Sequence, residues 1–100
     1  MKNIKVVDKK TFRLWCHEME LTTKQASALL RISRPQIYKY IDEGSGSDVN
    51  GTIKVICELI NLLDKSERIN FIIESLESES CDEPWPAKTP ISKFPIQIKR

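Results

Sequence analysis

The sequence predicts an all-α domain of five helices with an extended C-terminal tail. Apolar residues recur at helical spacing (i, i+3, i+4 and i+7) in successive segments up to residue 78. Glycine and proline are absent from residues 52–83, and the prolines at 84 and 86 stop any helix that would continue. At 100 residues, 40% of them hydrophobic, the chain suits one small domain. We assign residues 1–83 to this domain and residues 84–100 to a basic, proline-containing tail.

The first helix is expected over residues 9–20. Its apolar stripe repeats at i, i+3, i+4 and i+7, so one side of the helix faces a core. The stripe consists of Phe12, Trp15, Cys16 and Met19. Before it, residues 3–7 alternate weakly between polar and apolar types, which predicts a short strand.

Residues 21–44 predict two short helices, at 22–31 and 33–43, joined by a tight turn. Thr22 precedes Gln25 by three residues, and Ser33 precedes Gln36 by three, so each pair fits a capping box at a helix start. The short spacing between the first helix and the Ser33 cap matches the turn of a helix-turn-helix motif. The residues expected to be buried are Ala26, Leu29, Leu30, Ile37 and Tyr40 or Ile41.

Two further helices are expected at 52–63 and 66–78. The first carries a wide apolar band, which predicts burial on more than one side. This band contains Ile53, Val55, Ile56, Leu59, Ile60, Leu62 and Leu63. The second carries an i, i+3, i+4, i+7 stripe of Ile69, Ile72, Ile73 and Leu76, with Phe71 beside it. In the tail, Phe94, Ile96 and Ile98 alternate with other residues, which predicts a short strand that Pro95 confines to an edge.

Composition argues against several protein classes. The chain has one histidine, His17, no glycine-rich phosphate loop and no paired carboxylates in an apolar setting, so we expect no enzyme, catalytic residue or cofactor. The three cysteines (16, 57 and 81) are odd in number and widely spaced, which argues against a disulfide framework and a metal site. No run of about 18 apolar residues occurs. We therefore expect a cytoplasmic protein with no membrane or small-molecule partner.

Charge is distributed unevenly along the chain. Residues 1–47 carry nine Lys or Arg against five Asp or Glu, a balance of +4. Residues 48–83 carry three against nine, a balance of −6, and residues 84–100 carry four against none. A basic helix-turn-helix segment beside an acidic one predicts a side that faces DNA and a side that faces away from it.

Residues 21–44 resemble the helix-turn-helix of the phage-repressor/Cro (XRE-type) DNA-binding family, whose domains have the lambda-repressor-like fold. The matching residues are Leu21, Thr22, Leu30, Ile32, Ser33, Ile37 and Gly44, with the small Ser27 where the family has Ala. The chain departs from the family at Arg31, where the turn usually carries glycine. A residue there is expected to need a positive φ, which is uncommon for a side chain other than glycine.

The resemblance implies a sequence-specific transcriptional regulator of phage or bacterial type, a homodimeric repressor that binds double-stranded DNA. The helix at 33–43 would enter the major groove. By resemblance, the base-reading positions are Arg34, Pro35, Tyr38 and Lys39, with Gln36 close to them. Arg34 is the strongest candidate for a bidentate contact to guanine. Thr22 and Thr23 fall where the family contacts phosphate.

Two further expectations follow from this resemblance. The loop at 44–51 contains Asp48 and no Lys or Arg, so the N-terminal lysines or the tail would have to supply the phosphate contacts that the family makes there. The family also carries a buried Arg–Glu ion pair at the positions of Cys16 and Ile41. Because both charges are replaced by apolar groups, we expect both residues to be buried and to pack together or against a shared neighbour.

Other functions remain open at this level. An excisionase-like or MerR-like architectural DNA-binding factor would place a β-hairpin at 52–63. A protein-interaction module such as an antitoxin or adaptor would use the apolar surfaces at 52–76 and Trp85, and a helical hairpin without a nucleic-acid role is the simplest alternative. For the homodimer, we expect an interface on the fifth helix around Phe71, helped by the tail, whose strand would pair with residues 3–7.

Overall fold

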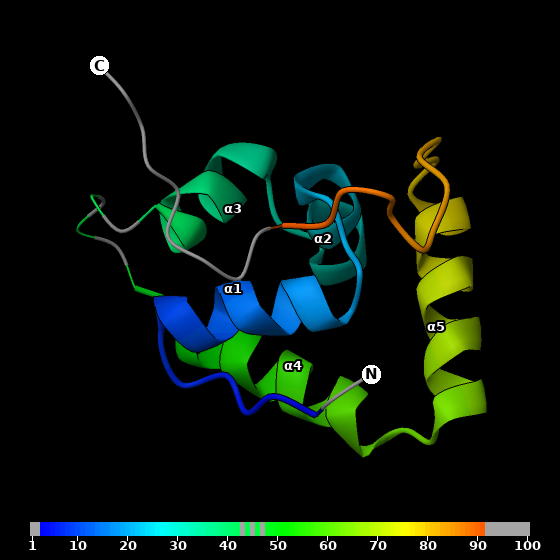
Figure 1. Ribbon diagram of the computed structural model, residues 1–100, viewed down its shortest axis with the longest axis horizontal. Coiled ribbons are helices and arrows are strands. Elements are labelled where there is room, and N and C mark those ends of the chain that lie inside the picture. Colours follow the sequence, from blue (N-terminus) through cyan, green and yellow to red (C-terminus); the bar gives the residue numbers. More distant parts are fainter. Residues whose placement is uncertain (1–2, 43, 45, 47, 92–100) are drawn as a thin grey trace.

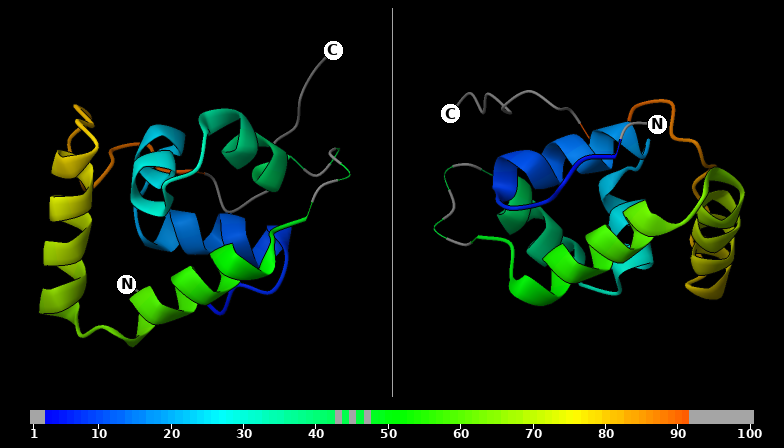
Figure 2. Two further views of the ribbon diagram at one scale, coloured as in Figure 1. Left: turned by 180° about the vertical axis from the view of Figure 1, so that it is seen from behind. Right: turned by 90° about the horizontal axis from the view of Figure 1, so that it is seen from below.

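The computed structural model describes residues 3–42, 44, 46 and 48–91, and within them it is an all-α globule. Its five helices are α1 (Lys9–Glu18), α2 (Thr23–Leu30), α3 (Arg34–Ile41), α4 (Gly51–Leu62) and α5 (Lys65–Ser78). In Figure 1, α1 lies between the α2–α3 pair and α4, and α5 stands at one end of the molecule. Figure 2 shows the same arrangement from behind and from below. The predicted fold class and number of helices are confirmed.

Polar side chains determine where the helices begin. The Thr22–Gln25 capping box is complete at the start of α2, and a second box, Asp8 with Thr11, starts α1. The Ser33 hydroxyl accepts the Gln36 N–H at 3.3 Å, which is one half of the box expected there. Asn50 and Asp64 cap the other two helices in the same way. Each helix therefore begins within about one residue of the start that the sequence predicted.

The predicted apolar stripes of the first three helices form the core. Phe12, Trp15 and Cys16 of α1 and its C-cap Met19 have no exposed surface, and all the residues expected to be buried in α2 and α3 are buried. The Phe12 ring stacks with Trp15 and meets Tyr40 of α3 edge to face, at centroid distances of 6.4 and 5.8 Å. These aromatic contacts hold α3 against α1.

A polar anchor joins α4 to the rest of the core. The Asn61 amide accepts the indole N–H of Trp15 at 2.9 Å and donates to the Ile4 carbonyl at 2.8 Å. Arg68, only 6% exposed, donates to the carbonyls of Asn61 and Leu63 at the end of α4. A cation at this position satisfies carbonyls that have no partner within the helix.

Three expectations about the N-terminal segment, the first helix and α4 were wrong. Residues 3–7 form no strand, because Ile4 bonds to a side-chain amide and the Val7 N–H to the Thr11 hydroxyl instead of to another strand. The first helix ends at Glu18, because Glu20 takes a left-handed conformation with φ 57°.

The third wrong expectation is that α4 is buried on several sides. Val55, Leu59 and Leu62 of this helix are 53–77% exposed. The strand expected around Phe94 lies outside the described residues.

Cys16 and Ile41 are buried, as expected from the replaced ion pair. They are 0% and 3% exposed and belong to the same apolar cluster. Burial raises the pKa of the Cys16 thiol well above its usual value, so the thiol is neutral. The site therefore suits two apolar side chains and no isolated charge.

We predict that Cys16→Arg lowers the free energy of unfolding by about 3 kcal/mol or more, because it buries a lone charge. Adding Ile41→Glu should recover part of that loss by supplying a partner. Urea unfolding of wild type, both single variants and the double variant gives the coupling free energy. Simple additivity of the two single effects would contradict a shared site.

Candidate nucleic-acid interface

The turn between α2 and α3 adopts the geometry that normally favours glycine. Arg31 has φ 59° and ψ 40°, in the left-handed region, and its N–H donates to the Ser27 carbonyl. The Ile32 N–H donates to the same carbonyl at 3.2 Å, and the Ser27 hydroxyl donates to the Ile32 carbonyl. These bonds give the Ser27 carbonyl two donors and the Ile32 carbonyl one, and they hold the turn despite the arginine.

The turn presents one side of α3 outward. Ile37, Tyr40 and Ile41 are at most 3% exposed and face the core. The candidate base-reading residues occupy the opposite side, and all of them are exposed: Arg34, Pro35, Tyr38 and Lys39. Gln36 is half-buried at the edge of that side. The helix is thus fixed by its inner face and free to meet a ligand with its outer face.

The two threonines at the start of α2 differ in their surroundings. The hydroxyl oxygens of Thr23 and Tyr38 lie 3.4 Å apart, which joins one predicted phosphate contact to a predicted base-reading residue. Thr22 is the N-cap of α2, and its hydroxyl donates to a Glu83 carboxylate oxygen at 2.6 Å. The structure therefore places an acidic side chain at a position where DNA phosphate was expected.

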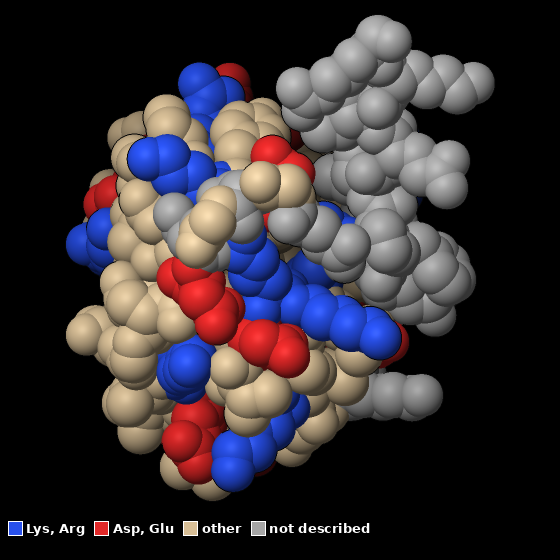
Figure 3. All heavy atoms as spheres, turned by 90° about the vertical axis from the view of Figure 1, so that its left-hand side faces the viewer, with Lys and Arg blue, Asp and Glu red and all other residues tan. Residues whose placement is uncertain are grey.

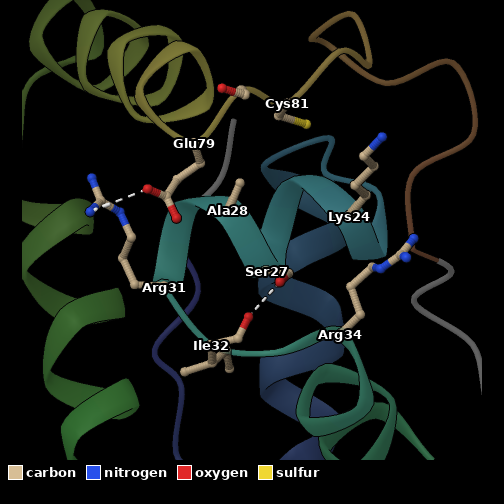
Figure 4. A pocket seen from close by; sticks show the side chains of 9 residues that line it. Lys24, Ser27, Ala28, Arg31, Ile32, Arg34, Glu79 and Cys81 are labelled. Atoms are coloured by element: carbon tan, nitrogen blue, oxygen red, sulfur yellow. Dashed lines mark hydrogen bonds and ion pairs between the residues drawn. The ribbon is translucent and has the colours of Figure 1, made fainter.

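A hollow of about 410 Å³ lies beside the motif, between α2, the start of α3 and the end of α5. Figure 4 shows Lys24 and Arg34 on one side of it and Arg31 with Glu79 on the other. The Arg31 guanidinium lies 3.5 Å from the Glu79 carboxylate. Lys24 and Arg31 were not among the predicted site residues. Arg31 was noted only for its backbone, although its charge could have marked it.

Lys24 is neutralised by Asp82. The ammonium group donates a hydrogen bond to the Asp82 carboxylate, which raises the pKa of Lys24 and lowers the pKa of Asp82. Any stabilisation from the lowered carboxyl pKa is present above the usual carboxyl value and is lost as pH falls through the lowered one. Because both groups are exposed to solvent, this pair acts on local charge more than on stability.

The basic and acidic segments of the sequence do not form two separate surfaces of opposite charge in the folded protein. Glu79, Asp82 and Glu83 belong to the acidic part of the chain, yet they bond to side chains of the helix-turn-helix. On the face seen in Figure 3, Lys and Arg side chains are interspersed with Asp and Glu. The expectation that the acidic segment faces away from the motif is therefore wrong at its C-terminal end.

A second hollow adjoins the loop that lacks Lys and Arg. Lys9 and Lys10 line a hollow of about 260 Å³ together with Asp8 and Asp48. The Lys9 ammonium donates to the Asp42 carbonyl at 3.0 Å, just beyond α3. The N-terminal lysines Lys9 and Lys10 thus lie beside the loop at 44–51, which has no Lys or Arg of its own.

The described residues contain no group of three or more His, Cys, Asp or Glu that could hold a metal ion. No helix in this part of the chain is long and apolar enough to cross a membrane. Burial raises the pKa of Cys57 to about 12, so this thiol, like that of Cys16, is no nucleophile at neutral pH.

Comparison of the chain with protein-family models, with curated proteins and with solved structures gives no match. The resemblance to the XRE-type family stays a prediction from the residues of the helix-turn-helix.

We predict that Arg31→Gly increases the free energy of unfolding relative to Arg31→Ala by about 1 kcal/mol. Both variants remove the exposed ion pair with Glu79, but alanine retains the strain of the left-handed conformation and glycine relieves it. Denaturant titration of the two variants makes the comparison. Equal stabilities would mean that the turn does not have this conformation in solution.

Proposed function

We propose that this chain is a sequence-specific DNA-binding transcriptional regulator that inserts α3 into the major groove. The observation that carries the proposal is the division of α3 into two faces. One face is packed against α1 and α2, and the other presents Arg34, Pro35, Tyr38 and Lys39 to solvent. A short helix held in this way, with polar residues near its N-terminus exposed, is what base recognition in the major groove requires.

Each exposed residue on α3 has a distinct role in this proposal. The Arg34 guanidinium forms two hydrogen bonds to guanine, and the Lys39 ammonium reaches a base or a phosphate. Pro35 and the Tyr38 ring make apolar contact, for which a thymine methyl group is the natural partner. Thr23 and the amide groups at the start of α2 bind phosphate, which positions α3 without reading sequence.

We further propose that the regulator is a homodimer, since one short helix reads only a few base pairs. A two-fold axis would present two copies of α3 to successive major grooves, about 34–36 Å apart. The apolar groove between α4 and α5 supports this assembly. It has a volume of about 300 Å³ and is lined by Ile56, Leu59, Ile60, Leu63 and Phe71. The resemblance to phage repressors supports repression as the regulatory outcome.

Of the alternative functions, one loses support and another keeps a specific observation in its favour. An excisionase-like or MerR-like factor would have a β-hairpin where this chain has the continuous helix α4, so that alternative loses support. An antitoxin or adaptor module keeps one specific observation in its favour, the exposed apolar side chains of α4 and α5. Leu59 and Leu62 of α4 are 57% and 77% exposed, and Phe71 of α5 is 40% exposed.

We predict that Arg34→Ala weakens binding to the preferred DNA site by about 1–3 kcal/mol and relaxes specificity at one base pair. Thr23→Ala should weaken binding more evenly across sequences, because a phosphate contact carries no base information. Selection from a random DNA library, followed by titration of the selected site, measures both effects. Unchanged affinity and base preference in Arg34→Ala would contradict the docking of α3.

For the dimer, we predict that Leu59→Lys produces a monomer at tens of micromolar, because it introduces a charge into the apolar groove. Val7→Lys is the matched control, since Val7 is a similarly exposed apolar residue outside this groove. Light scattering on the two variants and the wild type gives the assembly state. A monomeric wild type would remove the dimer, and a dimeric Leu59→Lys would move its interface elsewhere.

A further inference from the structure

Residues 81–91, which we call the strap, follow α5 and run back along the segment between the end of α1 and the start of α2. Figure 1 shows this segment in orange, passing from the end of α5 to α1 and α2. The Ala87 and Ile91 N–H groups donate to the carbonyls of Glu20 and Leu21, each at 2.9 Å. The Trp85 indole donates to the Met19 carbonyl, also at 2.9 Å. The strap is thus docked onto the segment that leads into α2.

A buried amide fixes the acidic end of the strap. Gln25 has no exposed surface, and its side-chain oxygen accepts the Thr22 N–H at 3.0 Å. Its side-chain nitrogen donates to the carbonyls of Glu83 and Pro84, at 3.2 and 2.8 Å. Because a buried amide that loses its partners is costly, this bonding holds Glu83 against the first turn of α2.

Two carboxylates of the strap are bonded to the polar groups that α2 would offer to DNA. Glu83 accepts the Thr22 hydroxyl at 2.6 Å, and Asp82 pairs with the Lys24 ammonium. The start of a helix also carries partial positive charge, which favours an anion there. Glu83 therefore bonds to Thr22, which the sequence predicted as a phosphate contact, and together with Asp82 it lies close enough to Lys24 to raise the pKa of that side chain.

We propose that the strap is an internal competitor of DNA, with Asp82 and Glu83 in the places of backbone phosphates at the start of α2. This inference rests on the proposed function and concerns its regulation. A phosphate and a carboxylate cannot share the Thr22 hydroxyl and the Lys24 ammonium, since like charges at such distances repel strongly. DNA must therefore displace the Asp82 and Glu83 carboxylates before the start of α2 can bind a phosphate of the DNA backbone.

The competition has a signature in the salt dependence of binding. The displaced carboxylates of the strap remain beside the DNA and offset the positive charge of Lys24, so in the wild type Lys24 adds little to the electrostatic part of DNA binding. Freeing one such cation should make the plot of log affinity against log salt steeper by about one unit. It should also tighten binding at low salt by a few-fold, because the ion pair that DNA must break is exposed to solvent.

The test compares two double variants that lose the same charge. Asp82→Asn with Glu83→Gln weakens the strap, whereas Glu74→Gln with Glu77→Gln removes two exposed carboxylates of α5 as the matched control. Affinity for duplex DNA is measured over a range of salt concentrations. We expect tighter binding and a steeper slope for the strap variant than for the control, and equal affinities and slopes would overturn the proposal.

Cys81 gives a second readout in the unmodified protein. It lies at the start of the strap and is half-buried, whereas Cys16 and Cys57 are fully buried and serve as internal controls. Reaction with N-ethylmaleimide, followed by mass spectrometry, should be several-fold faster at Cys81 once DNA is bound, because the strap has been displaced. An unchanged or slower reaction in the complex would overturn the proposal.

The two experiments distinguish failure of the strap proposal from failure of the proposed DNA-binding function. If wild type binds DNA, but the two double variants behave alike and Cys81 reacts at an unchanged rate, the strap proposal fails and the DNA-binding function stands. If neither wild type nor either variant binds DNA at any salt concentration, the proposed function fails and the strap proposal fails with it.

Discussion

The hydrogen bonding of one buried amide, that of Gln25, links the parts of this molecule on which recognition depends. The side chain completes the capping box of α2 and also binds two carbonyls nearly 60 residues further along the chain. An amide without exposed surface must satisfy its donors and acceptor within the protein. Docking of the strap backbone therefore supplies the acceptors that the side-chain nitrogen of Gln25 needs and stabilises the start of α2, whereas the carboxylates of the strap take no part in these bonds. Through the tight turn, the start of α2 also sets the position of α3.

The surface around α3 carries several positive charges, and some of them are paired with carboxylates of the same chain. Arg34 and Lys39 offer positive charge from α3 itself, and Lys24 and Arg31 stand close to the same end of the motif. The acidic partners of Lys24 and Arg31, Asp82 and Glu79, come from the other end of the domain. In our account, DNA affinity is thus the difference between phosphate binding and internal ion pairing. That difference responds to salt and to anything that stabilises or loosens the strap.

Local sequence predicted the helices well because their signals are local. Caps such as Thr22 and Asp64 lie within three residues of the N–H groups that they satisfy, and the α1 stripe needs only helical spacing. The strap could not be predicted in this way, because its partners are distant in sequence and carbonyl acceptors carry no residue signature. The width of the apolar band on α4 was visible, but spacing does not reveal whether the same chain covers it. Leu59 and Leu62 are exposed, which the sequence alone did not indicate.

The central claim is that this domain binds the DNA backbone and reads bases with α3. Titration of the wild-type protein with mixed genomic DNA, repeated at several salt concentrations, tests it most directly. DNA binding predicts a measurable affinity whose logarithm falls linearly with log salt, by about 0.9 for each phosphate contact. A protein-interaction module predicts no binding that depends on salt in this way. Absence of binding even at low salt would contradict the account.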